Sequence, residues 1–378
     1  MKIAILTTDN REYDKNYSNP QPWFGAAPEA LLQGFAALPG VEIHVVSCVQ
    51  QPVRSPAKLA DNIWFHSLHV PKFGWMRTLY QGCIRATRKK LNEIQPDIVH
   101  GQGTERDYAV SAIFSGFPNV LTIHGNMRAI AECYQARIGS FHWLAARLET
   151  FALRRTAGVF CNSAYTEALV APYAPQTWRV ANALRLPFFE VPLANASRPP
   201  LLLNVGMMEP RKQQVQLLKL AGNLRRRGLK FELQFVGKRD NRSEYGAAFA
   251  AELALAEKAG YAQHLGMLTA DQLIAAMDAA SALVHVPTEE AFGLVVAEAL
   301  ARNLKFFGSA AGGVVDIASG VDGAELFPPA DWTALETAIA GWIELGCPRP
   351  LNAASVMRER YHPLVIARRH LEIYRAVI

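Results

Sequence analysis

The sequence predicts an α/β protein built from two doubly wound, Rossmann-like domains. Short apolar runs rich in β-branched residues alternate with longer helical patterns along the chain, which is typical of parallel sheets with helices on both faces. The alternation restarts at Leu201, after a proline-rich stretch with no clear period. The chain has 378 residues and half of them are apolar, so two ordinary domains with sizeable cores are expected.

The first domain is predicted to begin with a buried parallel strand at residues 2–8. Further strands are predicted at residues 41–48, 63–70, 97–101, 119–125 and 158–163, and helices at residues 30–38, 77–94, 140–155 and 164–170. Residues 8–28 are polar, rich in turn formers and too long for a plain connector, so we expect a functional loop there.

The second domain repeats this pattern. Strands are predicted at residues 201–205, 231–237, 263–267, 282–286 and 304–308, and helices at residues 213–227, 244–258, 270–280, 291–302, 331–345 and 356–378. We therefore divide the chain into a first domain at 1–183, a linker at 184–200, a second domain at 201–355 and a C-terminal helical segment at 356–378.

The stretch 281–303 is the most informative in the chain. A buried strand, a short loop and a helix follow one another, and two carboxylates, Glu290 and Glu298, flank the helix start about two turns apart. Free N–H groups at a helix start attract phosphate, and Gly293 lets a ligand approach the backbone. The layout fits a nucleotide sugar, with Glu298 accepting ribose hydroxyls and Glu290 facing the sugar. A helix with one acid near its dipole and another on a solvated face fits the spacing equally well.

The run Glu290-Ala-Phe-Gly-Leu-Val-Val-Ala-Glu298 resembles the E-x7-E motif of glycosyltransferase family 4, a family of retaining enzymes with the two-domain GT-B fold. Ala291 stands where the family usually has Gly, and Leu300 where it has Met. The resemblance implies that 1–183 is the acceptor side, that 201–355 binds the nucleotide sugar, and that the C-terminal helix crosses back to the first domain.

The resemblance also implies roles for the residues of this motif. Glu298 is expected to bind the ribose, and backbone N–H groups near Gly293 and Leu294 the diphosphate. Glu290 and Phe292 are expected to hold the donor sugar.

A second candidate phosphate site follows the strand at 201–205. Gly206 opens a loop that carries Arg211 and Lys212 before a helix, which suits a diphosphate held by backbone amides and a cation. Lys212 matches the lysine of the family. Met207 stands where the family has Arg, so Arg211 is the candidate to replace that charge; ordinary solvated charges on a first helical turn are the alternative.

Two residues of the first domain complete the predicted site. His124 follows a parallel strand, at the sheet edge where such sheets bind ligands, and the resemblance assigns it to the donor sugar. Gly25 lies just ahead of a helix start where an anion can bind. The predicted catalytic residues are thus Glu290, His124 and Lys212.

The composition allows several classes of binding partner and does not select one. The net charge of +6 is compatible with an anionic ligand, a membrane surface or nucleic acid. The helix at 77–94 is basic and amphipathic, so peripheral contact with an anionic membrane stays open beside a solvated charged face. Five scattered cysteines without a C-x-x-C pair argue against a disulfide framework or a zinc site and fit a reducing cytosol. We see no leader or spanning segment and expect a cytoplasmic enzyme.

The sequence therefore predicts a retaining glycosyltransferase that uses a UDP- or GDP-linked sugar and acts on a sugar, glycolipid or small-molecule acceptor. No metal cofactor is expected, because cations and a helix dipole neutralise the diphosphate. A nucleotide-sugar epimerase of the same fold is the alternative, although the E-x7-E pattern lacks its acid and base groups. Nucleic-acid binding rests on net charge alone, since the chain shows no stripes of basic and aromatic residues.

Overall fold

The computed structural model describes residues 1–190 and 199–378. The chain forms two compact units: Met1–Arg185 together with Tyr361–Ile378, and Leu186–Arg360. The predicted linker at 184–200 falls at the boundary between them. Its residues 186–189 form a short 3-10 helix, η3 (Leu186–Phe189), and its residues 191–198 lie outside the described residues.

The first unit contains an eight-stranded sheet with the order β3-β4-β2-β1-β5-β6-β7-β8. Every neighbouring pair is parallel except β3 with β4. The strands are β1 (Lys2–Leu6), β2 (Glu42–Val49), β3 (Lys58–Ala60), β4 (Ile63–His69), β5 (Ile98–Gln102), β6 (Asn119–Ile123), β7 (Val159–Cys161) and β8 (Thr177–Arg179).

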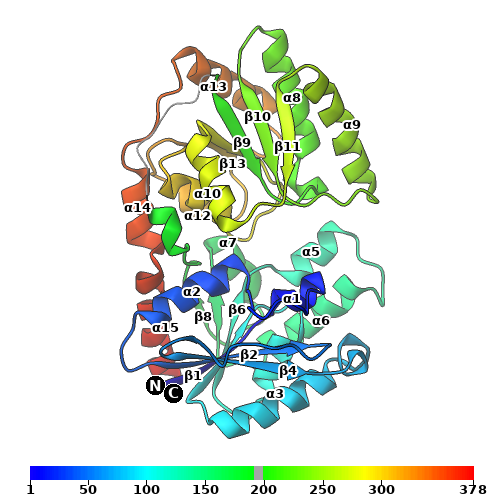
Figure 1. Cartoon of the computed structure of the whole chain (residues 1–378), viewed down its shortest axis with the longest axis vertical. Helices are drawn as coiled ribbons and strands as arrows, with labels where there is room; N and C mark the ends of the chain where they lie inside the picture. Colours follow the sequence, from blue (N-terminus) through cyan, green and yellow to red (C-terminus); the bar gives the residue numbers. More distant parts are fainter. Residues whose placement is uncertain (191–198) are drawn as a thin grey trace. The chain divides into compact units, whose positions relative to one another are not determined.

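Helices lie on either side of this sheet (Figure 1). They are α1 (Asn10–Asp14), α2 (Ala26–Ala36), η1 (Lys72–Gly74), η2 (Met76–Thr78), α3 (Gln81–Ile94), α4 (Asp107–Ile113), α5 (Met127–Cys133), α6 (Phe141–Leu153), α7 (Ala164–Val170) and, from the end of the chain, α15 (Pro363–Val377).

The last helix, α15, is part of the first unit's core. It packs along α2, where a Cβ on Gly34 would lie 2.2 Å from the carbonyl oxygen of Pro363. His370 stacks on Phe160 with ring centroids 4.5 Å apart, and the buried hydroxyl of Tyr374 bonds to His100. These contacts confirm the predicted return of the C-terminal helix to the first domain, although the return begins at Tyr361 rather than at residue 356.

The second unit contains a six-stranded, fully parallel sheet with the order β11-β10-β9-β12-β13-β14. Its strands are β9 (Leu201–Val205), β10 (Glu232–Val236), β11 (Ala262–Gly266), β12 (Ala282–His285), β13 (Lys305–Ser309) and β14 (Ala324–Phe327). Its helices are η4 (Pro210–Lys212), α8 (Gln214–Arg226), α9 (Glu244–Lys258), α10 (Ala270–Ala279), α11 (Leu294–Ala301), α12 (Val314–Ala318), α13 (Trp332–Glu344) and α14 (Ala353–Tyr361).

Some predicted boundaries were wrong. The helix expected at 291–302 begins only at Leu294, because Gly293 adopts the left-handed conformation (φ 97°) and breaks the pattern before it. Glu298 therefore lies about one turn into the helix rather than two. The helix expected at 77–94 begins at Gln81, after Leu79 and Tyr80, which both have positive φ.

Both sheets reverse their strand order once. In the first unit the reversal lies between β1 and β5, and in the second between β9 and β12. Successive helices cover opposite faces on the two sides of such a point, so the loops after the two strands diverge and leave a crevice at the carboxyl edge, where open α/β sheets bind their ligands. Each unit thus has one favoured edge for a site.

Candidate functional site

The reversal in the second unit joins the two stretches singled out in the sequence. β9 leads into Gly206 and η4, and the neighbouring β12 leads into the loop before α11. Two hydrogen bonds hold these loops together. Thr288 N–H donates to the carbonyl of Arg211 over 2.8 Å, and Gln213 Nε2 donates to the carbonyl of Val286 over 3.1 Å.

An ion pair lies between these loops. The Nζ of Lys212 contacts Oε2 of Glu290, and their side chains are only 10% and 14% exposed. His285 Nε2 lies 3.1 Å from the same oxygen. Burial raises the pKa of the Glu290 carboxyl, but Lys212 and His285 outweigh it and hold that pKa well below its usual range. Burial and the nearby Lys212 lower the pKa of His285, so a neutral ring donates to a permanently ionised carboxylate.

Arg211 already has carboxylate partners in the same loops. Its guanidinium lies 2.7 Å from Oε1 of Glu209 and 3.6 Å from Oε2 of Glu289. Met207 is half exposed, at the position where a family member has an arginine. Arg211 therefore has carboxylate partners before any ligand binds, and its role at the phosphates stays a prediction.

The start of α11 has no side-chain cap among the described residues. Gly293 precedes the eight residues of this helix. A cap would satisfy the first N–H groups, so they stay available to an anion beside Leu294. The carbonyl of Glu290 accepts from Gly313 N–H over 2.9 Å, which fixes the loop just before this helix.

The remaining predicted residues of this unit lie around the same helix start. Glu298 is 4% exposed on α11, and Phe292 is 3% exposed directly before Gly293. Gly206 follows β9, and its backbone N–H donates to the carbonyl of Val236. One local assembly thus contains seven predicted residues: Gly206, Arg211, Lys212, Glu290, Phe292, Gly293 and Leu294, with Glu298 on the helix behind them.

His124 and Gly25 belong to the first unit. His124 follows β6, and its Nε2 lies 3.0 Å from Oε1 of Gln102, which ends the neighbouring β5. Burial lowers the pKa of His124, although Glu105 and a hydrogen bond with Asn182 raise it. The ring is therefore mainly neutral at neutral pH and can act as a hydrogen-bonding group. Gly25 is the N-cap of α2 without a side-chain cap hydrogen bond.

A buried carboxylate supports the loops beside His124. Glu149 is fully buried on α6 and accepts from the Thr104 hydroxyl over 2.5 Å and from Met127 N–H over 3.0 Å. Burial raises the pKa of Glu149 to about 7, although these bonds act in the opposite direction. Glu149 thereby ties the loop after β5 to the start of α5.

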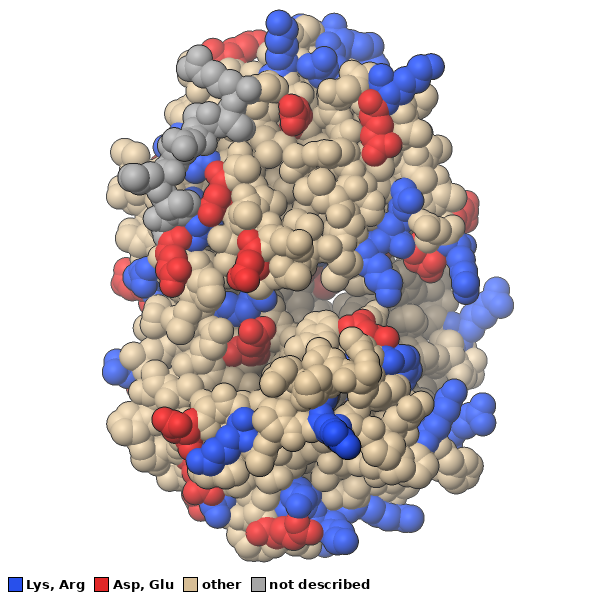
Figure 2. Space-filling view, viewed as in Figure 1, with Lys and Arg blue, Asp and Glu red and all other residues tan. Residues whose placement is uncertain are grey.

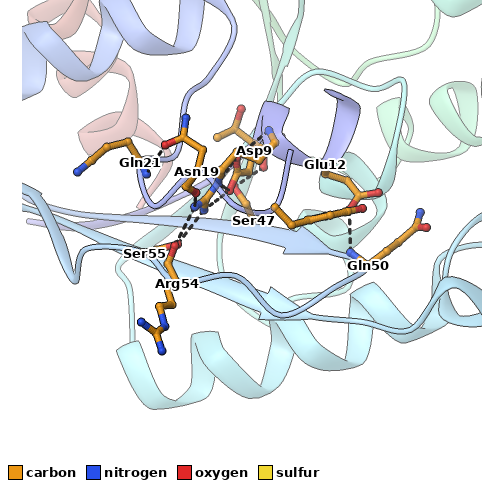
Figure 3. Close-up of polar contacts among 11 residues, drawn as sticks. Asp9, Glu12, Asn19, Gln21, Ser47, Gln50, Arg54 and Ser55 are labelled. Carbon is orange, nitrogen blue, oxygen red and sulfur yellow. Dashed lines mark hydrogen bonds and ion pairs between the residues drawn. The ribbon is translucent and has the colours of Figure 1, made fainter. Parts of the chain in front are cut away.

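The long polar loop of the first unit is organised by a fully buried arginine, Arg11. Figure 3 shows its partners Asp9, Asn19, Arg54 and Ser55. The guanidinium of Arg11 lies 2.6 Å from Asp9, and neither side chain is exposed to solvent. It also donates to the carbonyls of Asn19 and Arg54 over 2.9 Å each and to the Ser55 hydroxyl over 2.7 Å. The loop predicted to be functional is therefore a rigid wall of the crevice after β1, because a buried charge with these partners fixes its backbone.

Several of these residues were missed in the sequence. His285 is the one polar residue in the otherwise apolar strand β12. A polar residue in such a strand could have indicated a functional side chain. Arg11, Asp9 and Glu149 gave no signal, because charged residues in a polar loop or on a helix are normally solvated.

Two family models match the chain. Residues 188–360 match the model of glycosyl transferases group 1, and residues 29–181 match the model of glycosyltransferase family 4. The chain is a family 4 glycosyltransferase. No curated protein matches its sequence.

Solved structures share the GT-B fold of this glycosyltransferase. A sucrose-phosphate synthase from Thermosynechococcus elongatus superposes with a TM-score of 0.74 at 18% identity, covering 100% of this chain and 99% of that one. Anabaena HepE in complex with UDP and glucose gives 0.73 at 16% identity, covering both chains fully. The lipopolysaccharide outer core galactosyltransferase WaaB gives 0.69 at 14% identity, again over both full chains.

The surface of the glycosyltransferase shows no dominant charge on the side that is drawn. Basic and acidic side chains are interspersed among uncharged ones over that face (Figure 2). In the part of the chain that is described, none of the helices combines the length and the hydropathy that crossing a membrane requires.

Proposed function

We propose that this glycosyltransferase moves a sugar from a nucleotide sugar to an acceptor hydroxyl, with retention at the anomeric carbon and without a metal ion. One observation carries the proposal. The strand-order reversal of the second unit brings the Lys212–Glu290 ion pair to the uncapped start of α11, where the backbone and a cation converge on one anion site.

The chemistry follows from these charges. Negative charge grows on the diphosphate as it leaves, and donors already fixed at that place lower the barrier by a few kcal/mol. Lys212 has three N–H bonds and uses one on Glu290, so two remain for phosphate oxygens. The first N–H groups of α11, beside Gly293 and Leu294, supply the rest. This is the work that a divalent ion does in other phosphate sites, and it supports a metal-independent reaction.

Glu290 acts as a fixed negative charge. Its pKa lies well below the usual range, so it cannot donate a proton near neutral pH. A carboxylate in this place accepts hydrogen bonds from donor-sugar hydroxyls and stabilises the positive charge that develops on the sugar ring. Phe292, buried beside it, shapes the same side of the site.

The other roles rest on the resemblance and on position. Glu298 binds the ribose hydroxyls, and His124 contacts the donor sugar as a neutral hydrogen-bonding group. Gly25 lies before α2 and has a backbone conformation that any residue could adopt, with only an ordinary contact to Pro28 for an added Cβ. Close approach of a ligand is therefore our explanation for a glycine there.

The donor is most simply a UDP-linked sugar. The HepE structures are described as complexes with UDP and with UDP-glucose, and this chain has the same fold over its full length. GDP-linked sugars remain the second candidate. Retention is the behaviour of the family that the E-x7-E motif resembles.

The acceptor is a sugar, a glycolipid or a small molecule bound over the carboxyl edge of the first unit's sheet. A glycolipid would bring the enzyme to a membrane surface. The apolar positions of α3, such as Ile84 and Leu91, are buried, so only its exposed basic residues, Arg85, Arg88 and Lys89, could meet anionic lipid. Equal liposome binding by the wild type and by a variant with these three neutralised would remove the membrane contact. The cytoplasmic location remains a prediction.

The decisive experiment begins with a thermal-shift screen of UDP, GDP, ADP and their sugars, because a ligand that binds only the folded chain raises its melting temperature. The stabilising donor is then incubated with candidate acceptors, with and without a chelator, and the anomeric configuration of the product is read by NMR. A shift with a sugar nucleotide, chelator-resistant transfer and a retained anomer are expected. An inverted product contradicts retention, loss of turnover with chelator contradicts metal independence, and an epimer formed without acceptor identifies an isomerase instead.

A further inference from the structure

A cluster of three ligand-type side chains lies in the first unit, at residues to which the proposed reaction assigns no role. The cluster consists of Cys48 near the end of β2, Cys83 in the first turn of α3 and Asp107 at the start of α4. The two sulfur atoms and one carboxylate oxygen lie within 4.8 Å of one another. The cluster is the only such group found among residues 1–190 and 199–378. The spacing of the cysteines in the sequence argued against a zinc site, but the fold brings Cys48 and Cys83 together. We propose that Cys48, Cys83 and Asp107 form a binding site for a thiophilic divalent metal ion, with zinc as the expected occupant.

The distances suit that ion. Zinc binds thiolate sulfur at about 2.3 Å and carboxylate oxygen at about 2.0–2.2 Å, almost always as a tetrahedron. Two sulfurs on one tetrahedral ion are then about 3.7 Å apart, and a sulfur and an oxygen slightly less. The 4.8 Å within which the three atoms lie is about 1 Å more than these separations, so the cluster is close to the size that one ion requires.

The donor set favours zinc over the harder cations. Two thiolates are soft ligands that select zinc or copper(I), whereas magnesium and calcium prefer oxygen alone. A carboxylate as third ligand favours the divalent ion of the two. Three protein ligands leave a fourth position for water, and the Thr87 hydroxyl, 3.7 Å from the sulfur of Cys48, is a hydrogen-bonding partner beside it.

The cluster is buried in largely apolar surroundings. Cys83 is 0%, Cys48 7% and Asp107 8% exposed, within an apolar group that includes Trp75 and Val110. No lysine or arginine forms an ion pair with Asp107 in the described part of the chain. A buried carboxylate needs a counter-charge or a proton, and a bound cation would supply the charge.

The placement also indicates what the ion does. Cys48, Cys83 and Asp107 belong to three different elements, so one ion joins the end of β2 to the first turns of α3 and α4. The site is structural: it fixes α3 on the sheet and does not touch the reacting groups.

The test uses the full chain. Protein is isolated under reducing conditions, its zinc content is measured, and metal is then removed and replaced by cobalt(II) during refolding. We expect bound metal equimolar with the chain, a thiolate-to-cobalt charge-transfer band, the ligand-field bands of tetrahedral cobalt, and a higher melting temperature with metal than without. Cys83→Ala should weaken cobalt binding more than about 100-fold, since even groups that only orient metal ligands contribute tenfold to hundredfold. Asp107→Asn should shift the ligand-field bands.

Cys161→Ala is the matched control, because Cys161 is also fully buried in this unit but is absent from the cluster. It should keep the cobalt spectrum even if it costs some stability. A wild type without a charge-transfer band, or the same band in Cys83→Ala, overturns the proposal. So does a Cys48–Cys83 disulfide in protein isolated without reductant, which would identify an oxidisable pair instead.

Discussion

Replacing Lys212 should separate two tasks of one side chain. Lys212 neutralises Glu290 in the folded protein, and in the proposed reaction it also meets the diphosphate. Lys212→Met keeps most of the side-chain volume and removes the charge. It leaves the carboxylate of Glu290, 14% exposed, with the neutral ring of His285 as its hydrogen-bonding partner among the described residues, while Arg211 acts on it without forming an ion pair.

The size of the effect follows from the burial. Breaking a buried ion pair on one side costs about 3–5 kcal/mol, because the remaining charge is left uncompensated. The pair is slightly exposed, so the free energy of unfolding of Lys212→Met should fall by about 3 kcal/mol. Glu290→Gln should cost less, about 1–2 kcal/mol, because the flexible stem of Lys212 can carry its ammonium toward water. The double variant has no unpaired charge, so the two losses should not add.

Activity should respond differently from stability. Removing one fixed donor from a developing anion typically lowers kcat by about 10²–10³. Lys212→Met and the double variant should both lose about this much turnover, although the double variant recovers stability. Urea unfolding followed by tryptophan fluorescence gives the free energies, and donor turnover at saturation gives kcat.

Lys305→Met is the matched control. Lys305 pairs with Glu325 in the same unit, but Glu325 is 45% exposed, so the loss of stability should be about 1 kcal/mol or less and turnover should not change. A Lys212→Met protein as stable as the wild type would refute the buried pair. A double variant with wild-type turnover would refute the role of Lys212 in the reaction.

Three further predictions follow from single contacts. Met207→Arg places a new cation on a half-exposed position beside the proposed phosphate site. It should tighten binding of the nucleoside diphosphate about tenfold at low salt, as measured by calorimetry. An unchanged affinity would show that residue 207 does not contact the phosphates. Gly34→Ala inserts a Cβ 2.2 Å from the carbonyl oxygen of Pro363, so chemical unfolding should show a loss of about 1–3 kcal/mol, and wild-type stability would contradict the tight packing of α15. The pKa of Glu149 rises on folding from 4.5 to about 7, so between these values the folded chain holds more protons and its free energy of unfolding falls as pH rises. Glu149→Gln should flatten that slope in urea titrations from pH 5 to 7, and an unchanged slope would exclude Glu149 as its source.

The strands were predictable because buried parallel strands consist mainly of apolar residues. β9, β12 and β1 are short apolar runs, and a parallel sheet covered on both faces requires such runs. The order of the strands was not predictable from these runs alone. It decides that the loops after β9 and β12 are neighbours, and hence that Lys212 meets Glu290.

Two short helices could not be predicted from the sequence patterns. α1 and α5 have five and seven residues, and each is fixed by its N-cap, Asp9 or Asn126, rather than by an apolar stripe. Asp9 serves at the same time as the partner of Arg11, whose other bonds reach residues 43 and 44 positions away. Interactions of this range leave no local periodicity, so the loop at 8–28 could be recognised as unusual but not as rigid.

The charges of the second unit's site explain why Met207 matters. Arg211 and Lys212 face three carboxylates, those of Glu209, Glu289 and Glu290, while His285 is neutral. A diphosphate adds negative charge to a site in which Arg211 and Lys212 already have carboxylate partners. In the proposed reaction it binds through the neutral N–H groups at the start of α11 and through Lys212, and Glu290 then needs other hydrogen bonds. Hydroxyls of a donor sugar offer Glu290 such bonds, so the sugar and the diphosphate should bind cooperatively, and an arginine at 207 would weaken that dependence by supplying a cation with no carboxylate of its own.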